Sequence, residues 1–390
     1  MTRRVLFMIN SMAGGGSERQ TALLLQHLDR QAFEPELFLT HRSGPLLGEI
    51  PSDVKVHSFD DAPPSSGLYY PGKELRRQIR YVIDLIRQRS VDVIYDRTFH
   101  MTLLAGPAAH ATGVHNVSTI VSPPHVALPM VEKKFVFLKR KRLSKAYSQS
   151  GQVVAVSKQA ALSAEAYYGL PKSSVQVISN PVDLERVRAK SLQPADPPIT
   201  RQENRIHLVV VARMSEEKGH ADFLAALQQT ATRWPQTTPM LHVWLIGDGV
   251  LRAELETKAA QMNCGHTVEF LGLMSNPAPH IAAADALVLP SHFEGMPNVV
   301  LEAMTLNTPV IATSSGGTVE LQADEPTILF AKPQDPKSLA DQILNFFSDR
   351  ESANVRRDAA TRYVNANHDI QKTIVQIQDL LLLGSDHSQH

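Results

Sequence analysis

The sequence predicts an α/β protein with two domains, each built on a parallel β-sheet that helices cover on both faces. Short apolar runs rich in β-branched residues alternate with segments of helical length along almost all of the 390 residues, a pattern typical of buried parallel sheets. A chain of this length favours two domains, each large enough to bury its own core. The polar stretch 191–204, which holds three prolines, is typical of a linker or surface loop between them.

We expect a first domain at 1–180, a second at 181–368, and an apolar C-terminal helix at about 369–383 that must dock on a core. Strand-like runs occur in both halves. The expected strands of the first half are Arg4–Ile9, Glu36–Thr40, Val54–Phe59, Val91–Tyr95, Asn116–Val121, Val153–Ser157 and Val175–Ile178. Those of the second half are Ile206–Ala212, Leu241–Ile246, Val268–Leu271, Ala286–Leu289, Val310–Thr313 and Ile328–Ala331.

Composition describes an ordinary globular protein, with 43% hydrophobic and 20% charged residues. The single cysteine, Cys264, excludes an internal disulfide framework and fits a reducing compartment. We see no signal peptide and no apolar stretch near the ~20 residues needed to span a bilayer, so a cytoplasmic protein is expected. Residues 1–180 carry 22 Lys/Arg against 14 Asp/Glu, and residues 181–390 carry 17 against 25, which suggests an anionic partner for the first half.

A run of glycines, Gly14–Gly16, separates the first expected strand from the first expected helix. Ser17 is expected to cap a helix at Glu18–Leu28, and the glycine run can bring backbone N–H groups against a phosphate or a sugar. The G-x-G-x-x-G spacing and the P-loop sequence are both missing. Dinucleotide binding and ATP hydrolysis are therefore disfavoured.

Two histidines, His100 and His125, follow strands and are expected on loops at the carboxyl edge of the first sheet. They are candidates for the acceptor side of a site, whereas a surface or core role is the better interpretation of the other histidines. H-E-x-x-H, C-x-x-C and D-x-D patterns are missing, so we expect no metal and no cofactor.

A strongly basic segment, Glu132–Lys145, interleaves cations with apolar residues. It is either a solvated surface helix or an interfacial helix on anionic lipid. Nucleic-acid binding is the lesser option because no aromatic stacking motif accompanies the charge. The candidate membrane residues are Lys133, Lys134, Phe135, Lys139, Arg140, Lys141 and Arg142.

Two cations follow the first expected strand of the second half. Arg213 stands at its carboxyl end, where open α/β sheets bind ligands, and Lys218 is expected to begin the next helix. Together they can clamp a diphosphate, although two solvated loop charges are the alternative. Gly247 and Gly249 follow the next strand and permit close approach of a ligand or, equally, a tight turn.

Two carboxylates eight positions apart give the most informative segment, Glu294–Glu302. Pro297 suits a first helical turn, which places Glu294 on the preceding loop and Glu302 more than one turn inside a buried helix. A strand, a loop and a helix N-terminus form an anion-binding corner, and carboxylates there can bind the hydroxyls of a sugar nucleotide. Two surface glutamates are the alternative.

The order and spacing of these motifs resemble the retaining glycosyltransferases of family 4, which have the GT-B fold. The resemblance covers nearly the whole chain. It also rests on Val156-Ser157, Asn180–Asp183, Phe270–Gly272, Gly316-Gly317 with Glu320, and Asp335-Pro336. It implies two Rossmann-like domains facing each other across a cleft, with a C-terminal helix that crosses back to the first.

By this resemblance, Glu302 binds the ribose, Arg213 and Lys218 the diphosphate, and Glu294 the transferred sugar. The backbone around Leu271 meets the base. Further donor contacts are expected at Gly15, Gly16, Gly247, Gly249, Gly295, Met296, Asn298 and Val299. The family implies that the two cations replace a metal and that retention proceeds on the front face of the donor, helped by a donor phosphate oxygen. Many relatives carry a histidine on the loop after the fifth strand, whereas here that loop reads Val121-Ser-Pro-Pro-His125.

The expected function is transfer of a sugar from a nucleotide donor, with UDP favoured, to a cell-surface glycan or its lipid carrier. A nucleotide-sugar epimerase and a non-catalytic partner subunit are the alternatives. The intact set of two cations and two carboxylates argues against both. The sequence leaves open the sugar, the acceptor, the linkage and the oligomeric state, and it allows a reversible association with the inner face of the cytoplasmic membrane.

Overall fold

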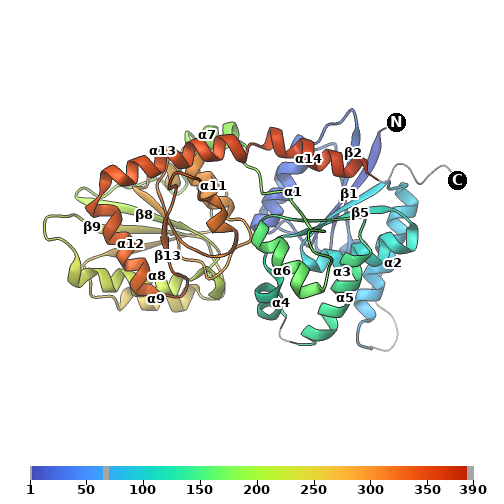
Figure 1. Ribbon diagram of the computed structural model, residues 1–390, viewed down its shortest axis with the longest axis horizontal. Coiled ribbons are helices and arrows are strands. Elements are labelled where there is room, and N and C mark those ends of the chain that lie inside the picture. Colours follow the sequence, from blue (N-terminus) through green and yellow to red (C-terminus); the bar gives the residue numbers. More distant parts are fainter. Residues whose placement is uncertain (1, 65–69, 133, 384–390) are drawn as a thin grey trace. The chain divides into compact units, whose positions relative to one another are not determined.

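The computed structural model describes residues 2–64, 70–132 and 134–383 (Figure 1). The chain divides into two compact units. The first contains the chain up to Pro181 and again from Ile370 onward, and the second runs from Val182 to Asp369. Within the described residues, no helix is both long and apolar enough to cross a membrane.

The first unit holds a parallel sheet of seven described strands in the order β3-β2-β1-β4-β5-β6-β7. Strand β1 lies between β2 and β4, where Val5 pairs with both Pro35 and Val93. The strands are β1 (Arg3–Ile9), β2 (Phe33–Leu39), β3 (Lys55–Ser58), β4 (Val93–Arg97), β5 (His115–Ile120), β6 (Gln152–Ala155) and β7 (Gln176–Val177).

Helices cover both faces of this sheet, because alternate residues of each strand point to opposite faces. Phe7 packs in the cluster that contains α1, whereas Leu6 and Met8 pack against α2 and α3. The helices of this unit are α1 (Gly16–His27), α2 (Lys73–Arg89), α3 (Phe99–Thr112), α4 (Pro124–Val131), α5 (Val136–Ser148), α6 (Lys158–Tyr168) and α14 (Ile370–Leu382), with short 3-10 turns at Pro45–Glu49 and Phe59–Asp61.

The C-terminal helix α14 packs in the core of the first unit, next to α1 (Figure 1). Its apolar residues recur at helical spacing and all enter the cluster that contains β1 and α1. Arg3 at the start of β1 donates a hydrogen bond of 2.7 Å to the carbonyl of Leu381. The buried residues of α14 in this cluster are Ile370, Ile374, Ile377, Leu380 and Leu381.

The second unit repeats this design with six described strands in the order β10-β9-β8-β11-β12-β13, again parallel. The strands are β8 (Arg205–Val211), β9 (Met240–Ile246), β10 (Thr267–Gly272), β11 (Ala286–Leu289), β12 (Val310–Thr313) and β13 (Leu329–Ala331). The helices are α7 (Leu184–Ser191), α8 (His220–Thr230), α9 (Arg252–Ala260), α10 (Ala278–Ala283), α11 (Asn298–Thr305), α12 (Pro336–Ser348) and α13 (Arg350–Asn367). Short 3-10 turns lie at Glu216–Lys218, Ala231–Arg233 and Gly316–Leu321.

The structure confirms the α/β class, the parallel sheets and the position of each expected strand to within a few residues. Two local expectations were wrong. Helix α1 begins at Gly16, with Gly15 at its N-cap and no side-chain cap. Ser17 therefore lies inside the first turn, because the helix begins within the glycine run. Lys218 ends a 3-10 turn, and Gly219 in the left-handed conformation separates it from α8.

Candidate functional site

Loops at the carboxyl edge of the second sheet are joined by backbone hydrogen bonds. After β8, Met214 N–H donates to Asp248 O at 2.9 Å, and Leu251 N–H, beyond β9, donates to Met214 O at 3.1 Å. Gly247 N–H donates to Gly272 O at 2.8 Å, at the end of β10. These hydrogen bonds connect the segments that follow β8, β9 and β10. Gly247 and Gly249 therefore lie in a turn that the neighbouring segments hold in place.

The loop that follows β11 is fixed in the same way from both sides. His292 N–H donates to Glu217 O at 2.8 Å, and Gly317 N–H donates to Glu294 O at 3.1 Å. A Cβ atom on Gly316, whose φ is +52°, would lie 1.9 Å from the Glu294 carbonyl oxygen. Only glycine fits this position, because both the backbone conformation and the contact exclude a side chain.

Glu294 and Lys218 form an ion pair at this edge. The Lys218 ammonium lies 2.7 Å from Glu294 Oε1, and the Ser291 hydroxyl donates to the same oxygen at 2.7 Å. Glu294 is only 9% exposed, so its charge needs these donors to offset the loss of water. The pair brings together two of the predicted site residues, from the loops that follow β8 and β11.

Arg213 follows β8 and is exposed. Among the described residues its guanidinium has no ion-pair partner, in contrast to Lys218. Glu302 lies in the second turn of α11 and is half-buried. Within the second unit, the sheet edge therefore presents one solvent-facing cation and one paired cation near the start of a helix.

The remaining predicted donor contacts lie at different depths. Gly295 and Met296 are buried beside Glu294, and Asn298 and Val299 form the half-buried first turn of α11. Leu271 is half-buried at the end of β10. Gly15 and Gly16 lie in the first unit, at the N-terminus of α1. The roles assigned to all of these residues stay predictions.

Sequence reasoning missed two polar residues of the loop after β11. Ser291 bonds Glu294, and His292 Nε2 lies 2.8 Å from Asp222 Oδ2, which ties the loop to α8. Both directly follow a buried strand, which was the available signal. Also in α8, His220 is buried, and neither of its ring nitrogens has a partner among the residues described. Burial, with a smaller contribution from Lys218, lowers its pKa to about 4, so it is neutral near pH 7.

The two acceptor-side candidates lie in the first turns of helices, and the expectation of loops was wrong. His100 is in α3, 3.1 Å from Glu132 Oε1, and burial lowers its pKa. His125 is in α4, and its Nδ1 lies 2.6 Å from the Ser163 hydroxyl. In both cases the helix begins one residue before the histidine, at Phe99 and at Pro124, so the loop after the strand is shorter than expected.

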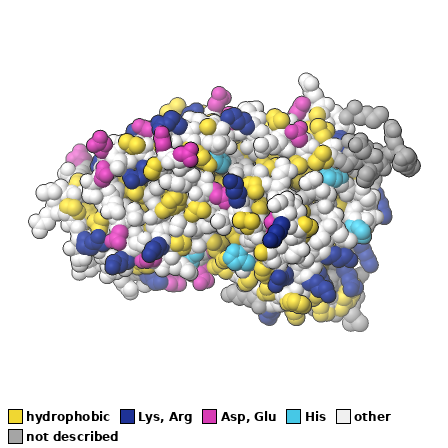
Figure 2. All heavy atoms as spheres, in the orientation of Figure 1, with side chains coloured by type: hydrophobic (Ala, Val, Ile, Leu, Met, Phe, Trp, Pro, Cys, Tyr) yellow, Lys and Arg dark blue, Asp and Glu magenta, His cyan; other side chains and the backbone are white. Residues whose placement is uncertain are grey.

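The basic segment forms α5, which begins at Val136 after Phe135 in the left-handed conformation. Phe135 and Phe137 are 75% and 77% exposed, and Leu138 is 45% exposed. On the face in Figure 2, basic and hydrophobic side chains lie side by side on the first unit. Lys133, one of the candidate membrane residues, lies outside the described residues.

The cations of this segment fall into two groups. Lys139 pairs with Glu132, and Arg140 stacks on Tyr167, 4.4 Å from the ring centroid, and donates to its carbonyl oxygen. The others are exposed and have no ion-pair partner among the residues that the structure describes: Lys134, Lys141, Arg142 and Lys145.

No group of three or more His, Cys, Asp or Glu side chains in the described ranges could hold a metal ion. Metal independence is a statement about the reaction, and it stays a prediction. Lys218 and Arg213 place positive charge at this sheet edge.

Family comparison matches both units. Residues 14–186 match the family described as Glycosyltransferase Family 4, and residues 205–349 match Glycosyl transferases group 1. The chain belongs to glycosyltransferase family 4. The suspected resemblance is thereby confirmed.

Curated relatives in this family act on glycans according to their names. LpsE of Rhizobium meliloti, a lipopolysaccharide core biosynthesis glycosyltransferase, is 32% identical over 150 residues, 37% of this chain and 39% of that protein. The N-acetylgalactosamine-N,N'-diacetylbacillosaminyl-diphospho-undecaprenol 4-alpha-N-acetylgalactosaminyltransferase of Campylobacter jejuni is 25% identical over 346 residues, 87% of this chain and 89% of that protein. In six of the curated relatives, LpsE among them, the chain matches less than half of the relative's length.

Solved structures of the same fold cover the chain almost completely. Anabaena HepE in complex with UDP has a TM-score of 0.76 at 20% identity and covers 97% of this chain and 99% of its own. Sucrose-phosphate synthase from Thermosynechococcus elongatus has a TM-score of 0.75 at 20% identity, with 97% and 98% covered. At these identities the similarity shows the fold, which is GT-B as expected.

Proposed function

We propose that this family 4 protein is an active, retaining, metal-independent glycosyltransferase that moves a sugar from a UDP-linked donor to a cell-surface or lipid-linked glycan. The observation that carries the proposal is the Lys218–Glu294 pair, 2.7 Å apart, at the carboxyl edge of the second sheet. Arg213 lies on the same loop as Lys218, after β8. Parallel α/β sheets bind nucleotides at this edge. The cations Arg213 and Lys218 can bind a diphosphate, and the carboxylate of Glu294 can accept hydrogen bonds from sugar hydroxyls.

The ion pair suggests how a donor is received. A diphosphate carries more negative charge than Glu294 and can take over the ammonium of Lys218, while the exposed Arg213 approaches from solvent. Glu294 then keeps the Ser291 hydroxyl, 2.7 Å away, and has lone pairs free to accept from sugar hydroxyls. The diphosphate thus replaces Glu294 as the partner of Lys218, and hydroxyl groups keep the Glu294 carboxylate hydrogen-bonded.

Catalysis follows from the same charges. As the glycosidic bond breaks, negative charge grows on the leaving nucleoside diphosphate, and fixed cations stabilise it more in the transition state than in the ground state. Arg213 and Lys218 fill this role. We propose that Glu302 binds the ribose hydroxyls, and that retention uses a donor phosphate oxygen in place of a protein nucleophile.

The nature of the acceptor is supported by the relatives' names alone. LpsE is named for lipopolysaccharide core biosynthesis, and the Campylobacter jejuni enzyme for a diphospho-undecaprenol-linked glycan. HepE was solved with UDP. We propose that the first unit of this chain binds an acceptor of the same general kind, with His100 and His125 on its side.

A panel of nucleotide sugars tests the proposed function. The protein is incubated with UDP-, GDP-, ADP- and CMP-linked sugars, and thermal stabilisation and nucleotide release are measured with and without EDTA. We expect a UDP-sugar to stabilise the protein and to be turned over at the same rate in EDTA. A requirement for added Mg²⁺ or Mn²⁺ that EDTA exposes would refute the metal-free clamp, and stabilisation by none of the donors would refute the donor site.

The exposed face of α5 suggests where the enzyme works. We propose that it binds anionic bilayers reversibly, as expected for an acceptor held in a membrane. Phe135 and Phe137 can enter the interface, and each nearby cation adds ~1 kcal/mol at moderate salt. These contributions suit reversible attachment and are too small for permanent anchoring.

The structure indicates which cations to change. Lys134, Lys141, Arg142 and Lys145 are exposed, whereas Lys139 is already paired. Replacing those four by glutamine should abolish co-sedimentation with phosphatidylglycerol vesicles. A control variant with the same charge change at exposed sites elsewhere in the first unit should bind normally: Arg76, Arg80, Arg87 and Lys172. Equal binding of wild type to phosphatidylcholine and phosphatidylglycerol vesicles would leave only a solvated surface helix.

A further inference from the structure

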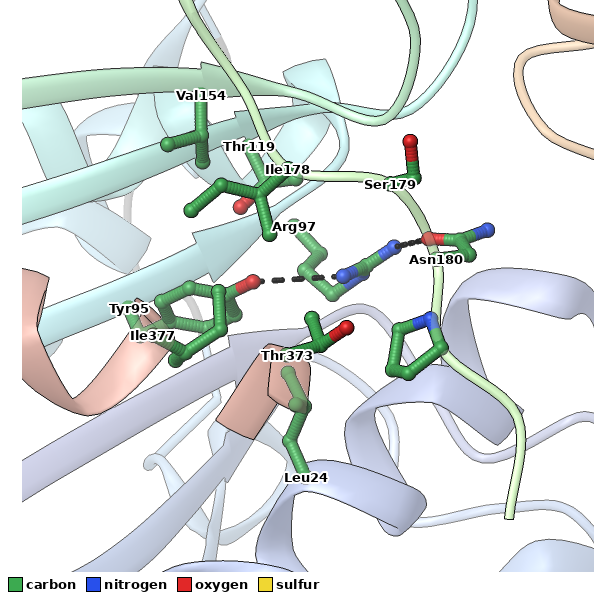
Figure 3. A pocket seen from close by; sticks show the side chains of 11 residues that line it. Leu24, Tyr95, Arg97, Thr119, Val154, Ile178, Ser179, Asn180, Thr373 and Ile377 are labelled. Atoms are coloured by element: carbon green, nitrogen blue, oxygen red, sulfur yellow. Dashed lines mark hydrogen bonds between the residues drawn. The ribbon is translucent and has the colours of Figure 1, made fainter. Parts of the chain in front are cut away.

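Arg97 is a buried cation in the first unit that the proposed reaction does not use. It is the last residue of β4, and only 4% of it is exposed. Its side chain lies on the sheet face covered by α1 and α14, next to Leu24 and Thr373 (Figure 3). A long charged side chain at such a depth normally has an anionic partner.

Its hydrogen bonds inside the protein are all to neutral groups. One guanidinium nitrogen donates to Asn180 Oδ1 at 3.1 Å and another makes a long contact of 3.4 Å to the Tyr95 hydroxyl (Figure 3). The third, Nε, is buried and has no partner in the described parts of the chain. Among the described residues, no carboxylate forms an ion pair with Arg97.

The adjacent carboxylate, Asp96, does not neutralise it. Asp96 points to the opposite face of the sheet, where it accepts 2.6 Å hydrogen bonds from the hydroxyls of Thr102 and Ser118. Burial raises the pKa of Asp96 to about 7, so at neutral pH much of it is uncharged. Among the described residues of the first unit, the positive charge of Arg97 is therefore uncompensated.

A small cavity lies against this guanidinium. Its volume is about 10 Å³, about what one water-sized occupant needs. Thr119 lines it, and its buried hydroxyl also lacks a partner within the ranges that the structure describes. Tyr95 and Ser179 add further hydroxyl groups to the wall. Several donors, one of them charged, thus line this small space.

We propose that this cavity binds a small monovalent anion of chloride size, held by Arg97, Thr119 and Tyr95. Arg97 supplies the charge and its Nε–H, and Thr119 supplies a second donor that lacks a partner among the described residues. Tyr95 supplies a hydroxyl that accepts from the guanidinium and can still donate. The bound anion neutralises the cation at the carboxyl end of β4 and stabilises the first unit. A water molecule has the right size but leaves the charge in place.

Salt-dependent thermal unfolding tests the proposal. The unfolding midpoint of the full chain is measured in sodium chloride and in sodium gluconate at one ionic strength, with the chloride fraction varied. For wild type we expect a saturable rise of ~2–4 °C with chloride, since an anion that binds only the folded state stabilises it by mass action. A midpoint that does not depend on chloride would overturn the proposal.

Variants locate the site. Arg97→Met and Thr119→Val should lose or weaken the chloride-dependent rise, whereas Arg201→Met, a surface control in the second unit, should keep it. If Arg97→Met does not fold, Thr119→Val still decides, because a full chloride response in that variant would contradict the site. Crystals soaked in bromide should show an anomalous peak beside Arg97. Density there without anomalous signal would identify a water and refute the anion.

Discussion

The two units share one strand order, yet the carboxyl edges of their sheets carry different chemistry. Strand β1 corresponds to β8 and β4 to β11 in the two orders. After β1 comes the glycine run Gly14–Gly16, whereas after β8 come the cations Arg213 and Lys218. One fold thus supports two kinds of edge, as expected where binding residues lie on loops positioned by a rigid sheet.

The ends of β4 and β11 show the same contrast in charge. β4 ends in Arg97, a buried cation without a carboxylate partner, whereas the loop after β11 presents Glu294, a buried carboxylate paired with Lys218 at 2.7 Å. In the second unit, the charge of Glu294 is balanced by Lys218 from a neighbouring loop. In the first unit, we propose that a bound anion balances the charge of Arg97. The two edges therefore differ in how each buried charge is compensated.

The largest expected effect concerns Asp96 and the response of the first unit to pH. Its pKa is raised from 3.8 to about 7 by burial, so the folded state keeps a proton that the unfolded chain releases. Stability is therefore lost as pH rises from about 4 to 7, by up to about 4 kcal/mol. Asp96→Asn should remove this loss. Hydrogen exchange of β4 and β5 amides would check it, and a stability difference from wild type that is constant between pH 4 and 7 would contradict it.

The second unit should respond in the opposite direction through His220. Burial lowers its pKa to about 4, so the unfolded chain takes up a proton that the folded state refuses. Stability should fall as pH drops from 6.5 towards 4, by up to about 3 kcal/mol. His220→Leu should flatten this fall, measured by hydrogen exchange in α8. The same acid response in the variant and in wild type would show that His220 is not its source.

A smaller effect is expected at Gly316, which supports the Glu294 loop. Alanine there would place its Cβ 1.9 Å from the Glu294 carbonyl oxygen, so the loop must move and donor affinity should fall about tenfold or more, an effect of ~1–3 kcal/mol. Gly113→Ala is the matched control, because its φ is also positive, +74°, and nothing lies within 4 Å of its Cβ position. Donor affinity is measured by calorimetry. Equal affinity in the two variants would show that the Glu294 loop does not contribute to donor binding.

The smallest effect is the division of labour between the two glutamates. Glu302→Ala should weaken binding of UDP and UDP-sugar alike, by about tenfold, as expected for a lost hydrogen bond to a charged group. Glu294→Gln should spare UDP and weaken only the sugar-bearing donor. Calorimetric titration of each variant with UDP and with UDP-sugar measures the two affinities. Equal losses for both ligands in both variants would contradict this division of roles.

Sequence reasoning predicted the strands well because parallel sheets buried on both faces demand continuous apolar runs. It placed β11 and β12 at their observed ends, Ala286–Leu289 and Val310–Thr313. It ended β4 at Tyr95 and so overlooked Arg97, because Asp96 and Arg97 are charged and an apolar pattern stops at them. Both are buried in the structure, where Asp96 accepts hydrogen bonds from Thr102 and Ser118.

Contacts between loops were beyond the sequence. The sequence groups Arg213 with Lys218 and Glu294 with Glu302, and no local pattern indicates that Lys218 and Glu294 lie 2.7 Å apart. That distance depends on the order of the strands, which places β8 beside β11. Likewise, the sequence does not indicate that the Ser291 hydroxyl donates to Glu294, because a serine after a strand is commonly a turn residue.

Turnover of the Arg213 and Lys218 variants tests the central claim most directly, namely that this sheet edge stabilises the leaving diphosphate. With the UDP-sugar that the protein accepts, Arg213→Ala and Lys218→Ala should each lower kcat by ~10²-fold or more, as for other preorganised charges aimed at a developing anion. Arg201→Ala, a surface cation of the same unit, should leave kcat unchanged. A folded Arg213→Ala/Lys218→Ala double variant with a near-normal rate would contradict the account.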